Sequence, residues 1–171
     1  KDIIESLDQL EIIRKQIDSH NLSDSNPAIN LASWITGIPI IYYPYGLQSV
    51  ATRFKSALQE NTKTHVMMED VIETCHNGIV AWEKPSIVQP ILIQGHDDYF
   101  KTKERFEIIK EFFIENSIDF KEIHSVPGNI LTKTISLMYL LDYTSIYKAI
   151  FSKTDPSPVL SINYIKSRLD V

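Results

Sequence analysis

The feature that most limits the fold of this chain is a nearly unbroken apolar run, IPIIYY, at Ile38 to Tyr43. Gly37 precedes the run, and Pro44 and Gly46 follow it, so turn-forming residues bound it on both sides. A strand with one face in solvent alternates apolar and polar residues, whereas this run offers no polar face. We therefore expect a central strand of a parallel sheet, buried on both faces.

A second run of this kind lies at residues 87–94, and helical patterns separate the strand candidates. The expected strands are 38–43, 65–68, 87–94 and 120–126. The expected helices are 3–17, 27–36, 47–60, 70–82, one whose apolar stripe includes Phe106, Ile109 and Phe113, then 130–151 and 158–169, with Ser157 as a cap of the last. Strands that alternate with long helices predict an α/β three-layer sandwich, with a mostly parallel sheet flanked by helices.

Charge and cysteine content narrow the classes of partner. The 171 residues carry 17 basic and 22 acidic side chains, a net charge of −5, which argues against nucleic acid as a partner. The single cysteine, Cys75, excludes an internal disulfide framework and fits a reducing compartment, so we expect a cytoplasmic protein. Proline and glycine interrupt the longest nearly uncharged stretch, residues 26–48, so we expect no transmembrane helix and no membrane partner.

Common catalytic motifs are absent from the sequence. It contains no glycine-rich dinucleotide fingerprint, phosphate loop, nucleophile elbow or His-Glu-x-x-His motif. His96, Asp97 and Asp98 offer metal-ligand types after a predicted strand, but three adjacent polar residues at such a place are more often a solvated loop. We therefore expect no metal site there.

One pair of residues suggests chemistry. Glu60 lies at the end of a predicted helix, and His76 follows it by sixteen positions, in a connection after a short strand. A carboxylate and an imidazole at element ends could share a cleft, because open α/β sheets bind ligands at the carboxyl ends of their strands. Spacing alone equally allows a surface carboxylate and a capping or core histidine.

A series of short blocks then gives the chain a family resemblance. They are NPA at 26–28, YPYG at 43–46, QENTK at 59–63, HN at 76–77, IVAWE at 79–83, MYLLD at 138–142 and DPSPV at 155–159. In order and spacing, the chain from Ile3 to Leu169 resembles the C-terminal half of the archaeal and bacterial bifunctional phosphoglucose/phosphomannose isomerases. The most specific part is the Glu-Asn-x-Lys block with the His-Asn and Trp-Glu pairs.

The resemblance implies a domain organisation. That family has two sugar-isomerase domains, so residues 26–171 are expected to be the C-terminal one, and residues 1–25 a linker helix. The chain begins at Lys1 without an initiator methionine, which fits a missing upstream domain. The Ser/Thr-rich phosphate loop and an arginine of the family's active site belong to that upstream domain, so we expect the 171 residues to be an incomplete enzyme.

The resemblance also implies a site and a reaction. Glu60 matches the catalytic base, His76 the histidine of ring opening, and Lys166 the lysine on the final helix, while Ser157 is assigned to substrate binding. The expected reaction converts glucose 6-phosphate or mannose 6-phosphate to fructose 6-phosphate through a cis-enediol, without metal or organic cofactor. We also expect a homodimer in which His76 completes the partner's site.

Two positions, Gly78 and Asp142, carry further expectations, and a second function fits the same fold. Relatives commonly carry an acidic residue where this chain has Gly78, so a carboxylate that would orient His76 is expected to be missing. Asp142, in an almost wholly apolar helix, is expected to be a buried carboxylate that a neighbouring hydroxyl or a helix end satisfies. The alternative function is a non-catalytic module that binds a sugar phosphate and regulates a partner. Such a module needs the same fold, but it does not need a catalytic base, an imidazole and a lysine together.

Overall fold

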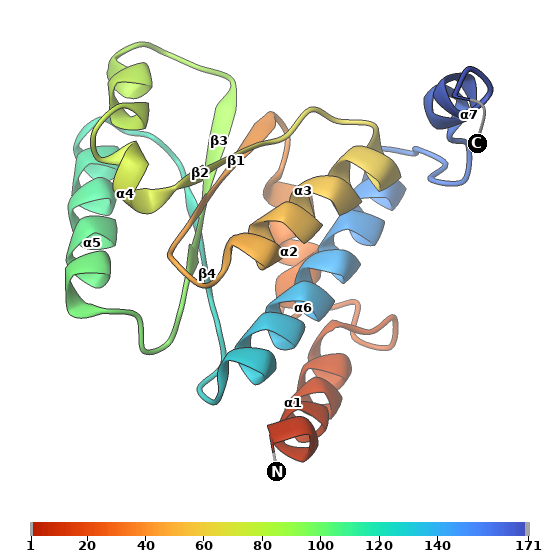
Figure 1. Ribbon diagram of the computed structural model, residues 1–171, viewed down its shortest axis with the longest axis horizontal. Coiled ribbons are helices and arrows are strands. Elements are labelled where there is room, and N and C mark those ends of the chain that lie inside the picture. Colours follow the sequence, from red (N-terminus) through yellow and green to blue (C-terminus); the bar gives the residue numbers. More distant parts are fainter. Residues whose placement is uncertain (1, 170–171) are drawn as a thin grey trace.

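The computed structural model describes residues 2–169 and shows a parallel sheet between two helical layers (Figure 1). The strands are β1 (Ile38–Tyr43), β2 (Met67–Asp70), β3 (Val88–Gln94) and β4 (Lys121–His124), in the spatial order β2-β1-β3-β4. In the register of the sheet, Ile41 of β1 lies opposite both Met68 of β2 and Ile91 of β3. All of these pairings are parallel, which confirms the predicted α/β three-layer fold.

Helices cover both faces of the sheet. One layer holds α1 (Asp2–Ile17), α2 (Pro27–Trp34), α3 (Gln48–Thr62) and α6 (Ile130–Phe151), and α6 packs against the other three. The other layer holds α4 (Val71–Thr74), the 3-10 helix η1 (Gly78–Glu83) and α5 (Phe100–Glu115). The last helix, α7 (Leu160–Lys166), stands apart from both layers at the end of a linker (Figure 1). No helix among residues 2–169 has the length and apolar character needed to cross a membrane.

Alternate residues of β1 reach the two layers. Ile41 belongs to the core that α3 and α6 cover, whereas Tyr42 belongs to the core that η1 and α5 cover, and both side chains are fully buried. Burial of a large apolar side chain contributes about 1.5–3 kcal/mol. The absence of a polar face in this run therefore reflects two cores that share one strand.

The buried tyrosine of β1 also accepts a hydrogen bond from a buried tryptophan. Trp82 donates its Nε1–H to the hydroxyl of Tyr42 at 2.9 Å, and burial, the main cause, raises the pKa of Tyr42 to about 12. We expect Tyr42→Phe to lower the free energy of unfolding by about 1–3 kcal/mol, because the indole N–H would remain buried without an acceptor. Urea denaturation measures this loss, with Tyr45→Phe, at a 93% exposed position, as the neutral control. An unchanged midpoint for Tyr42→Phe would show that the bond contributes nothing.

The helical region predicted at 70–82 forms two short elements, α4 and η1, with a turn between them. Gly78 begins η1 against the carboxylate of Glu69, and a Cβ at this glycine would lie 2.1 Å from Oε2 of Glu69. The contacted atoms are at the end of a flexible side chain, so Glu69 could move aside for a larger residue at position 78. The close approach places a carboxylate beside residue 78, although that residue is not itself acidic.

Strand β2 begins two residues later than the predicted 65–68, because α3 runs on to Thr62. The hydroxyl of Thr62 donates to the carbonyl oxygen of Leu58 at 2.6 Å, as in a continuing helix, and Lys63 then ends α3 in a left-handed conformation. Ser157 does not cap α7. The residue before α7 is Val159, and the backbone N–H of Ser157 donates instead to Asp155 Oδ1 at 2.9 Å, in a turn before the helix.

Helix α1 buries its apolar side chains only toward its C-terminal end. Ile13 and Ile17 lie in the core, whereas Ile3 is 67% exposed and Leu7 is 58% exposed. Ser6 faces α6 instead, with its hydroxyl 2.9 Å from that of Thr132, and this rotation leaves Ile3 and Leu7 to the side.

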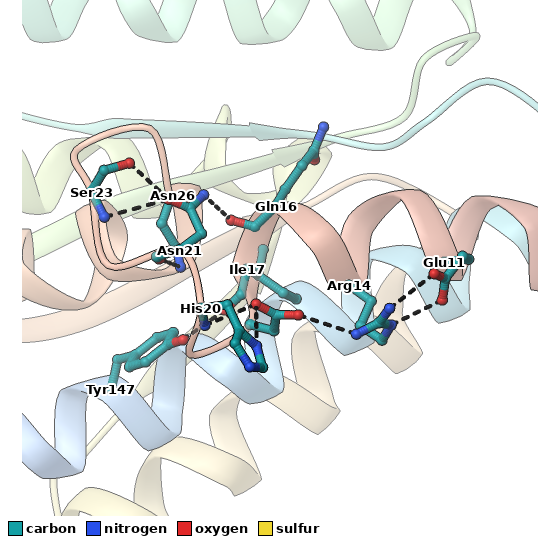
Figure 2. A network of polar contacts seen from close by, with 10 residues as sticks. Glu11, Arg14, Gln16, Ile17, His20, Asn21, Ser23, Asn26 and Tyr147 are labelled. Atoms are coloured by element: carbon teal, nitrogen blue, oxygen red, sulfur yellow. Dashed lines mark hydrogen bonds and ion pairs between the residues drawn. The ribbon is translucent and has the colours of Figure 1, made fainter.

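A polar network fixes the end of α1 (Figure 2). The hydroxyl of Tyr147 on α6 donates to the carbonyl oxygen of Ile17 at 2.7 Å, and Arg14 pairs with Glu11 at 2.9 Å. Asn26 caps α2 by accepting the N–H of Ala28 at 2.9 Å, and its amide donates back to the loop between α1 and α2. Helix α1 is therefore part of the packed helical layer, while the predicted division at residues 25 and 26 stays a prediction.

Asp142 on α6 differs from the expectation. Its carboxylate pairs with the guanidinium of Arg53 on α3, with a distance of 2.9 Å between Oδ1 and Nε, and its side chain is 31% exposed. A hydroxyl partner and full burial were therefore wrong predictions. The sequence could not show that α3 and α6 lie side by side and bring these residues together.

Candidate active site

Glu60 lies in the last turn of α3, with its side chain exposed. Its backbone carbonyl accepts a hydrogen bond from Lys63 Nζ at 2.6 Å. Within residues 2–169, no hydrogen bond or ion pair holds its carboxylate, which therefore projects from a fixed backbone into solvent. Such a carboxylate can accept a proton from a ligand that approaches the end of α3.

His76 lies in the connection between α4 and η1, and its side chain is also exposed. Its backbone N–H donates to the carbonyl oxygen of Glu73 at 2.9 Å, and the side-chain amide of the next residue, Asn77, donates to the carboxylate of Glu73. These contacts fix the backbone and leave the imidazole free of protein partners among the described residues. The imidazole can therefore meet a group from outside its own chain.

The sheet separates Glu60 from His76. Helix α3 packs on the face of the sheet that Ile41 reaches, whereas the α4–η1 segment packs on the opposite face with Tyr42 (Figure 1). Helix α3 precedes β2 and α4 follows it, so the two residues also stand at opposite ends of that strand. The structure therefore does not bring the two residues together within one chain, and their roles in a site stay a prediction.

The remaining two predicted site residues lie on the C-terminal segment. Ser157 and Lys166 are both exposed, and α7 has no buried residue. The carbonyl oxygen of Pro156 accepts a hydrogen bond from Lys63 Nζ at 3.1 Å, and the same ammonium donates to the carbonyl of Glu60. The chain thus brings the start of this segment to the turn that carries Glu60, and Lys63 is a residue that our sequence reasoning gave no role.

A crevice lies at the carboxyl ends of β1 and β3, where the chain continues to β2 in one direction and to β4 in the other. The cavity there has a volume of about 470 Å³ and is lined in part by Tyr45, Gly46, Asp97, Asp98 and Lys133. Lys133 pairs with Asp97, and burial raises the pKa of Asp98, which accepts the N–H of Gly95 at 2.7 Å. Two carboxylates line this crevice, and the ammonium of Lys133 is already paired with one of them, so the crevice does not favour a phosphate group.

The loop at His96 shows no gathering of metal ligands. The backbone N–H of His96 donates to Ser125 Oγ at 2.9 Å, and the neighbouring aspartates have the partners described above. Across residues 2–169, no three side chains of histidine, cysteine, aspartate or glutamate lie together as a metal site would need.

Solved structures of other proteins share this fold. A glucose-6-phosphate isomerase like protein from Thermus thermophilus matches with a TM-score of 0.74 at 17% identity, over 96% of this chain and 55% of that one. The tagatose-6-phosphate ketose/aldose isomerase of Escherichia coli matches with a TM-score of 0.65 at 10% identity, over 89% of this chain and 44% of that one.

The family is narrower than the fold. Residues 24–169 match the model of the bacterial phospho-glucose isomerase C-terminal SIS domain, and the chain belongs to this family. A bifunctional phosphoglucose/phosphomannose isomerase from Caldicellulosiruptor bescii is 31% identical over 137 residues, which are 77% of this chain and 40% of that protein. One of the same description from Aquifex aeolicus is 25% identical over 95% of this chain and 52% of its own length. The family match confirms the resemblance seen in the sequence. The chain spans about half the length of the curated relatives it matches.

Proposed function

We propose that this chain is the C-terminal half of a sugar-phosphate isomerase that converts glucose 6-phosphate or mannose 6-phosphate to fructose 6-phosphate. The family match over residues 24–169 supports this assignment most strongly. Such an enzyme would be cytoplasmic and would serve hexose-phosphate metabolism in glycolysis and gluconeogenesis. In this proposal residues 1–25 link an upstream sugar-isomerase domain to the domain at residues 26–171.

The proposed reaction moves one proton between two carbons. His76 moves a proton at the ring oxygen and opens the hexose, since histidine side chains serve widely as general acids and bases. Glu60 takes the proton from C2 of the open aldose and gives it back to C1 of the cis-enediol, while the hydroxyl proton on O2 passes to O1. Lys166 holds the charge that develops on the sugar oxygens, and Ser157 contacts the substrate. No step of this sequence calls for a metal or an organic cofactor.

Two observations indicate that a complete active site needs groups from a second subunit and from the upstream domain. Because the sheet separates Glu60 from His76, we propose a homodimer in which His76 of one copy completes the site that contains Glu60 of the other. Because the crevice of this domain presents paired carboxylates, we propose that the upstream domain binds the phosphate group. The substrate would then lie between groups of three different domains.

Solvent deuterium tests the proposed reaction. The protein with both domains is incubated with glucose 6-phosphate in D₂O, and NMR follows the product. We expect fructose 6-phosphate with deuterium at C1, because a proton held by Glu60 exchanges with solvent before it returns. The same result should be obtained in the presence of EDTA.

Two outcomes would contradict the proposal. Product without any deuterium would exclude a solvent-exposed carboxylate as the carrier of the proton. Tight binding of the sugar phosphate with no product at all would favour the regulatory module instead. Heat-inactivated protein under the same conditions controls for non-enzymatic exchange.

A further inference from the structure

Lys63 ends α3 in an unusual way. Its backbone has a φ of 57°, a left-handed conformation that glycine adopts most easily at the end of a helix. A residue with a long side chain occupies this position instead, and the side chain is exposed. Packing therefore does not explain a lysine at this position, whereas the contacts of its ammonium group do.

The ammonium of Lys63 joins two segments that are far apart in the sequence. Nζ donates to the carbonyl oxygen of Glu60 at 2.6 Å and to that of Pro156 at 3.1 Å. The first bond satisfies a free carbonyl at the C-terminal end of α3, where a positive charge is also favourable. The second bond holds the linker between α6 and α7. One side chain thus connects the turn of Glu60 to the linker.

This connection is the sole hydrogen bond that attaches the C-terminal segment to the rest of the described chain. The other hydrogen bonds of residues 155–169 stay within the segment, such as the one from the N–H of Ser157 to Asp155. That bond is the main cause of a lowered pKa of Asp155, and the nearby charge of Lys63 adds to it. The place where the segment leaves the domain therefore depends on Lys63.

The neighbouring residue fixes the other side of the same turn. Asn61 donates its side-chain amide to Ser145 Oγ on α6 at 2.8 Å, so the end of α3 is fastened to α6 as well. With Asn61 and Lys63 on either side, the backbone that carries Glu60 has one fixed position relative to both α6 and the linker.

We propose that Lys63 is a positioning residue that holds the start of the C-terminal segment beside Glu60. The segment carries Ser157 and Lys166, so the role of Lys63 in turnover rests on the proposed function. The structural half of the inference, the attachment of the segment by Lys63, is independent of the proposed function. Lys63 touches no substrate in this proposal; it sets the point from which the two substrate-facing residues extend.

Spin labelling tests the structural half. A nitroxide at Ser157→Cys, in a Cys75→Ser background that removes the native thiol, reports the mobility of the linker by electron paramagnetic resonance. We expect Lys63→Met to raise the mobility of the label and Lys63→Arg to retain the restricted spectrum, because a guanidinium can still donate to both carbonyls. Lys153→Met is the matched control, since Lys153 is also left-handed (φ 52°) and its ammonium has no hydrogen bond to any described residue. Equal mobility in Lys63→Met and the unsubstituted chain would overturn the proposal.

Turnover tests the functional half in the protein with both domains. We expect Lys63→Met to lower kcat by up to about a hundredfold with a smaller change in KM, and Lys63→Arg to restore most of it. Normal kcat in Lys63→Met, together with a mobile label, would overturn the role in turnover and leave the linker attachment standing. If the unsubstituted protein shows no isomerase activity, the proposed function fails, and the label still decides the attachment.

Discussion

Two inactive variants of the protein with both domains should restore each other's activity when their subunits mix. Glu60→Gln and His76→Asn are each expected to lower kcat by about 10²–10⁴-fold, the usual contribution of a general acid or base. In a mixed dimer, the His76→Asn subunit supplies an intact Glu60 and the Glu60→Gln subunit supplies an intact His76. Random exchange should therefore return about a quarter of the original activity, because half of the dimers are mixed and one of their two sites is complete.

The measurement is a coupled assay after the two variants are unfolded together and refolded as a mixture. Each variant treated alone in the same way is the control, and we expect it to stay inactive. A site built from one chain predicts an inactive mixture, since every chain would lack one of the two groups. The separation of Glu60 and His76 by the sheet is the reason to expect recovery.

The sequence predicted best the elements whose limits are set locally. Strand β1 and helix α6 have the predicted bounds, Ile38–Tyr43 and Ile130–Phe151, and Gly37, Pro44 and Asn129 stand next to three of their four ends. Strand β2 was misplaced because its four residues, Met67–Asp70, show no apolar run and lie at the edge of the sheet. The limits of a short edge strand depend on where it pairs with the neighbouring strand, and no local sequence pattern records that pairing.

The same distinction applies to the site. The family resemblance pointed to Glu60, His76, Ser157 and Lys166 as candidates, and the structure leaves all four exposed. Their mutual arrangement depends on which face of the sheet each crossover covers, a property of the whole chain. The contacts of Lys63 were hidden for a similar reason, because its partner Pro156 comes from a segment more than ninety residues further on.

Gly37 should be the glycine least tolerant of substitution. It lies between α2 and β1, and a Cβ added there would lie 2.0 Å from the backbone carbonyl oxygen of Ile87. That oxygen already accepts the N–H of Ile38 at 3.1 Å, so the clash falls where the pairing of β1 with β3 begins. A backbone atom cannot rotate away as a side chain can. We expect Gly37→Ala to lower the free energy of unfolding by about 3 kcal/mol, the upper part of the range for overpacking.

Gly46 is the comparison position for Gly37, because an alanine at Gly46 would strain the backbone conformation without a steric clash. Its φ is 90°, which disfavours alanine, but the nearest atom to an added Cβ is Ile130 Cδ1 at 3.9 Å, an ordinary contact. We expect Gly46→Ala to cost about 1 kcal/mol from conformation alone. Urea denaturation of both variants measures the difference. Equal losses would mean that the approach of Ile87 to Gly37 relaxes at little cost, and that the start of the central strand pair is less rigid than its close contact indicates.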